Sequence, residues 1–257
     1  MPARLARSAS DLLAVIRARR PRVHCITNTV AQAFTANALL AVGAVPSMTT
    51  APDEIAAFAG SADALLVNLG TLEPERRAVI RTAIEAASAG GRPWLLDPVF
   101  IDRSAGRAAF ARDLAALGPA AIRGNGAEMA VLGAEGDARA LAARLGTVVA
   151  ATGETDVVTD GRRLAGIANG HPLMARVTAM GCAGAAVTAA FLAVADDPFE
   201  ATGAAMLALG IAGEIAAETA RGPGSFAAAY LDALYGLDAL ELAAHARLDT
   251  SIAGGAP

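Results

Sequence analysis

Short apolar runs alternate with longer, mixed segments along most of this chain. Apolar runs bounded by turn-forming residues are typical of strands buried on both faces of a sheet, and they occur near 23–26, 64–69, 94–97, 120–123 and 147–151. The segments between these runs predict helices, over about 30–42, 73–89, 104–117 and 137–145. Strands that alternate with helices predict an α/β fold with a mostly parallel central sheet and helices on both faces.

Local signals place the remaining elements. Ser10 is a candidate N-cap for a helix over 11–19, and Pro74 falls in the first turn of the 73–89 helix. Asp160-Gly161 predicts the turn of an antiparallel hairpin. Further elements are expected as extended residues at 45–48, short helices near 53–59 and 126–132, hairpin strands near 156–159 and 163–168, and helices near 198–219 and 224–243. We expect one domain over 1–257, with a flexible tail at 248–257.

The most informative junction leads from a turn at 178–181 into an apolar helix that begins at Cys182. Small residues at such a junction let backbone N–H groups approach a ligand, and the helix start adds unpaired donors and partial positive charge. This combination favours an anion site, usually for phosphate, although a buried helix that starts with small residues can also be plain packing. A helix start also lowers the pKa of a thiol, so Cys182 is a candidate reactive cysteine.

Polar residues occur wherever a predicted parallel strand stops. Ligands of open α/β sheets bind at the carboxyl ends of the strands, so these positions together predict one site. They are Thr27-Asn28, Asn68 with Gly70-Thr71, Asp97-Pro98, Arg123 to Asn125, and Thr152-Gly153.

Composition narrows the chemistry. All 21 cationic residues are arginine, which excludes a P-loop lysine and a lysine Schiff base. A net charge of −4 gives no basic footprint for nucleic acid. The two distant cysteines predict reduced thiols in a cytoplasmic protein. The apolar stretches at 183–195 and 201–213 are short and separated by Asp196-Asp197-Pro198, so we expect no membrane span.

Three oxygen-bearing residues are candidate metal ligands. Asp97 closes an apolar strand and could be a loop carboxylate, or could orient a substrate hydroxyl or Mg²⁺. Asn125 and Glu128 begin a helix with Asn-x-x-Glu spacing. They could form a capping arrangement or supply oxygen ligands to hydrated Mg²⁺.

Arg123 ends an otherwise apolar strand and is costly to bury unless it meets an anion. In a chain without lysine it is therefore the leading phosphate contact. Thr152 begins a small turn that suits a nucleotide, although many strand ends have this form. We interpret His24 and His171 as structural, and packing is the default role for Met48.

At these residues the chain resembles a known family, hydroxyethylthiazole kinase. The matching blocks run in the family's order from about residue 10 to 240: His24-Cys-Ile-Thr-Asn28, Ala36-Asn-Ala-Leu-Leu-Ala41, Asn68-Leu-Gly-Thr71, Leu96-Asp-Pro-Val99, Ile122-Arg-Gly-Asn125 with Glu128, Ala151-Thr-Gly-Glu154, Asn169-Gly-His-Pro-Leu-Met174 and Gly222-Pro-Gly-Ser-Phe226.

The resemblance implies a ribokinase-like α/β fold, assembled as a homotrimer with active sites at subunit interfaces. It implies ATP- and Mg²⁺-dependent phosphorylation of the hydroxyethyl arm of 4-methyl-5-(2-hydroxyethyl)thiazole in thiamine biosynthesis or salvage. Small-molecule thiazole alcohol and ATP are then the partners, with neither nucleic acid nor a membrane involved.

The resemblance also implies a role for each matching residue. Met48 is similar to the family's thiazole contact, and Asn28 to a polar residue near the substrate. Cys182 occupies the position where related sugar kinases carry a catalytic aspartate. The remaining roles are ATP contacts at Arg123 and Thr152, a metal and phosphate region at Asp97, Asn125 and Glu128, and substrate contacts through the backbone at Ala179 and Gly181.

Two loops depart from the family's pattern. The family's Gly-Thr-Gly-Cys is Ala179-Met-Gly-Cys182 here, and its Gly-Val-Gly after Asp-Pro-Val is Phe100-Ile-Asp102. A backbone contact at position 179 survives a methyl group if φ stays negative, but not if the loop needs φ > 0. Two other functions stay open: a kinase for another heteroaromatic alcohol such as a hydroxymethylpyrimidine, and a non-catalytic thiazole- or nucleotide-binding protein.

Overall fold

A nine-stranded sheet forms the centre of the computed structural model, which describes residues 2–134 and 137–249. The strand order is β2-β1-β3-β4-β5-β6-β7-β8-β9. Strands β1 to β6 all run parallel to their neighbours in this part of the sheet, and β7, β8 and β9 each run antiparallel to the strand before them. The strands are β1 (Arg22–Ile26), β2 (Val45–Ser47), β3 (Ala64–Asn68), β4 (Trp94–Asp97), β5 (Ala121–Asn125), β6 (Val148–Thr152), β7 (Asp156–Thr159), β8 (Leu164–Ile167) and β9 (Leu248–Asp249).

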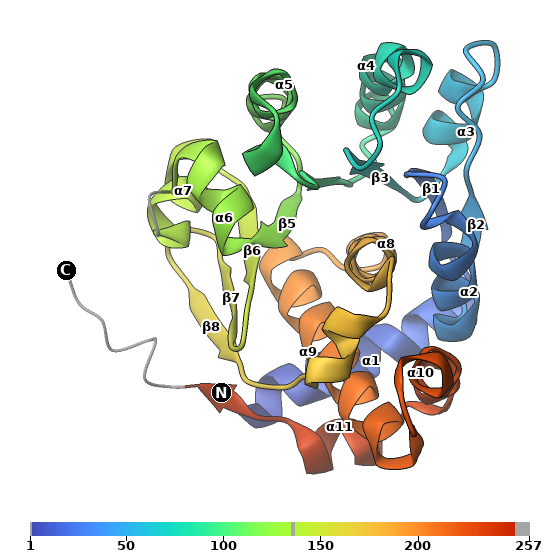
Figure 1. The fold of residues 1–257 in the computed structure, drawn as a ribbon, viewed down its shortest axis with the longest axis vertical. Helices are drawn as coiled ribbons and strands as arrows, with labels where there is room; N and C mark the ends of the chain where they lie inside the picture. Colours follow the sequence, from blue (N-terminus) through green and yellow to red (C-terminus); the bar gives the residue numbers. More distant parts are fainter. Residues whose placement is uncertain (1, 135–136, 250–257) are drawn as a thin grey trace.

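Helices cover both faces of the sheet, as predicted (Figure 1). One face is covered by α3 (Ile55–Ser61), α4 (Pro74–Ala89), α5 (Ala105–Ala115), α6 (Gly126–Met129) and α7 (Ala138–Leu145). The other is covered by α1 (Pro2–Arg19), α2 (Gln32–Val42), α8 (Met180–Leu192), α9 (Pro198–Thr219), α10 (Pro223–Gly236) and α11 (Ala239–His245). Single helical turns occur at Ile101–Arg103, Ala130–Ala134 and Pro172–Arg176.

The two layers have separate hydrophobic cores because successive strand residues point to opposite faces of a sheet. In β3, Leu66 packs in the α8–α9 core, whereas its neighbours Leu65 and Val67 pack in the α4–α5 core. All five β3 residues are buried. The uninterrupted apolar run is thus the expected signature of a strand covered on both sides.

Three predicted boundaries are wrong. The first helix begins at Pro2, so Ser10 lies inside it rather than at its start. The segment predicted as one helix over 224–243 is two helices, because Asp238 caps a new helix by accepting from the N–H groups of Leu240 and Glu241. Helix α8 begins at Met180, so Cys182 is its third residue. Of the predicted tail, Leu248 and Asp249 pair with β8, and 250–257 lie outside the described residues.

Helix α9 is long and apolar enough to cross a membrane by composition. It runs through the interior of the fold, however, and 83% of its most apolar window is buried against other elements. A core helix of a folded domain passes the same test of length and hydropathy.

The carboxyl ends of the parallel strands meet at one edge of the sheet, beside the N-terminus of α8 (Figure 1). Helix α8 packs across β1, β3 and β4, and its residues from Ala183 to Leu192 are buried. Its small side chains allow this close approach. The first turn of α8 therefore lies next to the polar residues that end these strands.

Candidate active site

A row of hydrogen-bonded polar side chains joins three adjacent strand ends. Asn28, just after β1, donates from Nδ2 to Oδ1 of Asn68 at 3.2 Å. Asn68, at the end of β3, donates in turn to Oδ2 of Asp97 at 2.6 Å. All three side chains are buried, and the arrangement leaves no room for a side chain at Gly70, where a Cβ atom would lie 2.8 Å from Asn28 Nδ2. The residues expected at the site are therefore brought together and fixed in orientation.

Cys182 extends this row from the first turn of α8. Its Sγ accepts a hydrogen bond from Asn28 Nδ2 at 3.4 Å. The expectation that the helix start lowers the pKa of this thiol is wrong: burial, and then the nearby Asp97 charge, raise the pKa to about 11. Cys182 is therefore a neutral thiol at pH 7.

Asp97 is a buried carboxyl group beside a cation. Burial raises its pKa from 3.8 to about 7, against the opposing effect of Arg123, and Glu128 adds to the rise. A carboxyl group with this pKa changes charge near neutrality. Such perturbed groups gather at functional sites.

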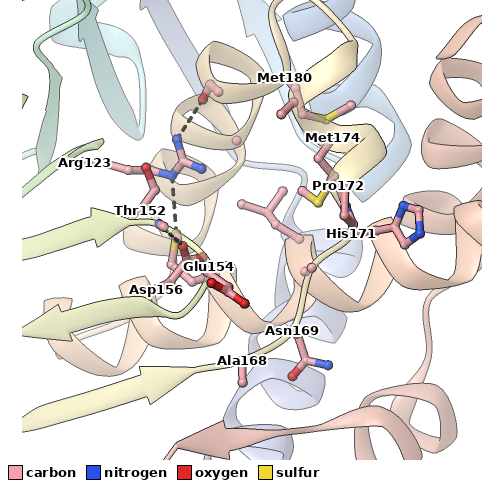
Figure 2. Close-up of a pocket in the computed structure, with 18 of the residues that line it drawn as sticks. Arg123, Thr152, Glu154, Asp156, Ala168, Asn169, His171, Pro172, Met174 and Met180 are labelled. Carbon is pink, nitrogen blue, oxygen red and sulfur yellow. Dashed lines mark hydrogen bonds between the residues drawn. The ribbon is translucent and has the colours of Figure 1, made fainter. Parts of the chain in front are cut away.

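Arg123 projects from β5 toward the first turn of α8 (Figure 2). Its Nη1 donates to the carbonyl oxygen of Gly181 at 2.9 Å, and its Nε donates to Met206 Sδ at 3.3 Å. A Cβ atom at Gly184 would lie 2.9 Å from Nη2, so the missing side chain makes room for the guanidinium group. Neither hydrogen-bond partner is an anion, and the charge of Arg123 remains available to a ligand.

A cavity of about 700 Å³ opens beside Arg123 (Figure 2). Thr152 lines it from the end of β6, where it pairs with Asn125 of β5. Its polar wall includes Glu154 and Asp156, and Asp156 Oδ1 accepts from the Gly153 N–H at 2.9 Å. Apolar residues also line the cavity, among them Met174, Met180, Met206 and Leu209. A cavity with an apolar lining and a cation at one end suits a planar ligand that carries an anionic group.

Asn125 and Glu128 form a capping box at the start of α6. Asn125 Oδ1 accepts from the Glu128 N–H at 3.0 Å, and Glu128 Oε2 accepts from the Asn125 N–H at 2.9 Å. The other carboxylate oxygen of Glu128 accepts from the Phe100 N–H at 2.8 Å. Burial raises the pKa of Glu128, with these hydrogen bonds acting in the opposite direction. The capping interpretation is therefore confirmed, and the charge of Glu128 also raises the pKa of Asp97.

Met48 follows β2, the neighbour of β1, and is not among the residues that line the cavity. The two histidines have local partners: His24 contacts Ser47 Oγ at 2.8 Å and the Thr49 carbonyl oxygen at 3.0 Å, while His171 accepts from the Leu173 N–H at 3.2 Å. These contacts agree with a structural role for both rings.

Ala179 adopts the left-handed conformation, with φ 67° and ψ −2°. The loop therefore does need a positive φ, which costs a side-chain-bearing residue roughly 1–2 kcal/mol. We expect Ala179→Gly to stabilise the protein by about 0.5–1 kcal/mol, since glycine's extra freedom in the unfolded chain offsets part of that gain. Urea unfolding measures the effect.

A matched control for this prediction lies one turn into the same helix. Ala183 is fully buried in α8, where Ala→Gly should destabilise the protein by about 1 kcal/mol. If Ala179→Gly were destabilising as well, the loop would not hold the strained conformation described here.

Sequence reasoning missed several residues of the site. Asn68 was recognised as a strand end but not as the link between Asn28 and Asp97. The strand-end pattern could have assigned it, because neighbouring strand ends meet. Gly184 and Met206, which contact Arg123, lie inside apolar helices, and no local pattern distinguishes them from packing residues.

Known proteins share this fold and much of this sequence. A ribokinase-like superfamily protein from Enterococcus faecalis shares the fold, with a TM-score of 0.66, 15% identity and coverage of 88% of this chain and 93% of that one. A hydroxyethylthiazole kinase from Pyrococcus horikoshii OT3 is far closer, with a TM-score of 0.89, 39% identity and coverage of 94% and 98%. A hydroxyethylthiazole kinase from Klebsiella pneumoniae strain 342 is 50% identical over 238 residues, covering 86% of this chain and 92% of the relative.

The fold is of the ribokinase-like class, and the relatives that are 39% and 50% identical are kinases. The hydroxyethylthiazole kinase family matches residues 13–239. The chain belongs to that family.

Proposed function

We propose that the protein transfers the terminal phosphoryl group of ATP to the hydroxyl group of 4-methyl-5-(2-hydroxyethyl)thiazole, in thiamine biosynthesis or salvage. Family membership supports the activity and the substrates. The observation that carries the proposal is the position of Arg123. Among the residues that the structure describes, this cation has no anionic hydrogen-bond partner. It lies against the α8 N-terminus, between the cavity and the polar row that ends at Cys182.

In this proposal Arg123 and Thr152 contact the nucleotide, with Asn125 beside them. Helix α8 presents the N–H groups of its first turn, from Ala179 to Cys182, to the transferring group. Phosphoryl transfer depends mainly on such positioning and electrostatic stabilisation. The thiazole alcohol lies on the Cys182 side, with Asn28, Met48 and the Gly181 backbone as its contacts. The backbone contact at Ala179 is left out of the proposal because φ is positive there.

We propose Mg²⁺ as the metal, with Asp97 and Glu128 as its protein ligands. Within residues 2–134 and 137–249, no group of three or more histidine, cysteine, aspartate or glutamate side chains is placed to hold a metal ion. Mg²⁺ usually takes only one or two carboxylates and completes its shell with water and phosphate oxygens. The two carboxyl groups are buried and the charge of Glu128 raises the pKa of Asp97, so the pair fits that donor set, and bound Mg²⁺ would neutralise phosphate charge.

We further propose a cytoplasmic homotrimer that binds neither nucleic acid nor membranes. The net charge of −4 supports the absence of nucleic acid. A trimer with sites between subunits would also explain why Met48 lies outside the cavity of a single chain.

The decisive experiment measures ADP release by the purified protein with ATP and Mg²⁺, with and without the hydroxyethylthiazole. Release that depends on the thiazole is expected. Preference for a hydroxymethylpyrimidine in the same assay would instead favour the other kinase. Thiazole binding in calorimetry without any ADP release would favour the non-catalytic binding protein.

Cys182→Ala should lower kcat by about tenfold and should not abolish turnover. With a pKa of about 11 the thiol is protonated at pH 7, so it contributes a hydrogen-bond contact rather than a free base, whose loss would cost about 10²–10⁴-fold. Steady-state kinetics at pH 7 measure the difference. A folded Cys182→Ala protein with no detectable turnover would show instead that the thiol takes the substrate proton.

A further inference from the structure

One wall of the cavity is a loop rather than a helix or strand. Residues 168–172 connect β8 to the helical turn at Pro172–Arg176, and they line the cavity opposite Arg123 and Thr152 (Figure 2). Asn169 is 5% exposed, and its side chain points away from Arg123. A buried polar side chain that turns away from the cavity must be held by groups behind the wall.

Glu214 of α9 holds this wall from behind. Its Oε1 and Oε2 accept from Asn169 Nδ2 at 3.1 and 3.0 Å, and Oε1 accepts from the Gly170 N–H at 2.7 Å. Arg247 donates to the same carboxylate, from Nη1 at 3.0 Å and from Nη2 at 2.5 Å. Charge-assisted hydrogen bonds of this kind are among the strongest in proteins.

Asn169 completes the network by joining the loop to the C-terminal part of the chain. Its Nδ2 also donates to the His245 carbonyl oxygen at 2.8 Å, and its Oδ1 accepts from the Arg247 N–H at 2.8 Å. The Arg247 guanidinium group further contacts the Ala168 carbonyl oxygen at 3.1 Å. Each polar group of the Asn169 side chain is therefore used for support.

Helix α9 is shaped to receive this loop. A Cβ atom at Gly210 would lie 2.6 Å from the Asn169 carbonyl oxygen, and one at Gly213 would lie 2.5 Å from Met174 Sδ. Both glycines are in the interior of a long helix, where glycine is normally unfavourable. The glycine face and the adjacent Glu214 together fix the depth at which the loop sits.

We infer that Glu214 is a positioning residue for nucleotide binding: it holds the Ala168–Pro172 wall in place through Asn169 and Gly170. This inference rests on the proposed function, which assigns the cavity to ATP. Glu214 does not line the cavity, so its effect must pass through the loop. A wall fixed before binding spares the ligand the cost of ordering it.

Glu214→Gln tests the inference with little change of shape. Among the residues that the structure describes, every hydrogen-bond partner of the two Glu214 carboxylate oxygens is an N–H donor. In either orientation, the side-chain amide of glutamine would therefore place its NH₂ group against another donor. We expect the KM for ATP and the calorimetric Kd for ADP to rise about tenfold, the low end of the value of one charge-assisted hydrogen bond. The KM for the thiazole, and kcat at saturating ATP, should change less than about twofold.

Two further variants complete the experiment. Glu218→Gln makes the same change of charge on an exposed residue one turn along α9, and it should leave every constant unchanged. Arg247→Met removes the exposed guanidinium group that donates to Glu214. It should raise the KM for ATP by about two- to threefold and leave the KM for the thiazole unchanged. It keeps the inference testable if Glu214→Gln does not fold.

The outcomes separate the inference from the proposed function. A Glu214→Gln protein that is less stable but binds ADP as tightly as the wild type would overturn the inference, as would an equal rise in both KM values. A wild-type protein that binds ADP but shows no thiazole-dependent turnover would contradict the proposed function alone, because ADP calorimetry measures the effect of Glu214 without catalysis.

Discussion

Arg123→Met should lower kcat/KM for ATP by about 10²–10³-fold, the usual cost of removing one preorganised group that stabilises transition-state charge. Arg123 is placed at the α8 N-terminus by the Gly181 carbonyl oxygen and Met206. The cavity that opens beside it provides the space for a nucleotide. With no lysine in the chain, no side-chain ammonium group can replace the lost guanidinium charge. Steady-state kinetics with varied ATP measure the effect.

Two controls separate charge from shape. Arg123→Lys retains the charge but loses the planar fork that can bind phosphate through two hydrogen bonds, so it should recover only part of the activity. Arg163→Met removes a guanidinium group that pairs with Asp160 and Asp197 on the surface, and its turnover should stay near the wild-type value. If Arg123→Met retained most of the wild-type kcat/KM, the phosphate contact would lie elsewhere.

Much of the fold could be predicted from local sequence signals because their physical causes are local. Pro74 begins α4, where its fixed φ and missing N–H cost nothing. Gly43 ends α2 with φ 97°, a conformation that favours glycine. The Asp160-Gly161 turn connects β7 and β8 in an antiparallel pair. Two of the predicted helix boundaries are wrong at polar residues, Ser10 and Asp238. The side chains of such residues suit both a helix cap and an exposed helix surface, so the local sequence does not decide between them.

The candidate site was predicted less completely. Strand ends such as Asn28, Asp97 and Arg123 were recognisable because topology alone brings them to one edge of the sheet. The contribution of Glu214 was not recognisable, since its partners Asn169 and Arg247 lie 45 and 33 residues away in sequence. The predicted lowering of the Cys182 pKa is wrong for a related reason. The helix start acts locally, whereas the burial and the Asp97 charge that raise the pKa arise from tertiary structure.

Asp97→Asn should inactivate the enzyme while making it more stable at high pH. A group whose folded pKa is raised from 3.8 to about 7 binds its proton more tightly in the folded state. The unfolding free energy of the wild type therefore falls as pH rises between these values, by up to about 4 kcal/mol. Asparagine carries no charge and can still accept from Asn68 Nδ2, so the variant avoids that loss. Turnover should fall by at least about a hundredfold, because the proposed metal-binding carboxylate is gone.

The pH dependence distinguishes this explanation from a general effect of the substitution. Urea unfolding without nucleotide or Mg²⁺ should give similar stabilities for wild type and Asp97→Asn near pH 4, and a growing advantage for the variant up to pH 8. Asp197→Asn is the matched control: its hydrogen bonds to Arg163 lower the pKa of Asp197, so that variant should be less stable than the wild type at pH 7, with the deficit shrinking as pH falls below 4. A difference between Asp97→Asn and wild type that stayed constant from pH 4 to 8 would show that burial of a charge at Asp97 is not what destabilises the site. The folded protein loses stability at neutral pH because it holds a buried carboxyl group at position 97, close to Arg123 and Glu128, before any ligand binds.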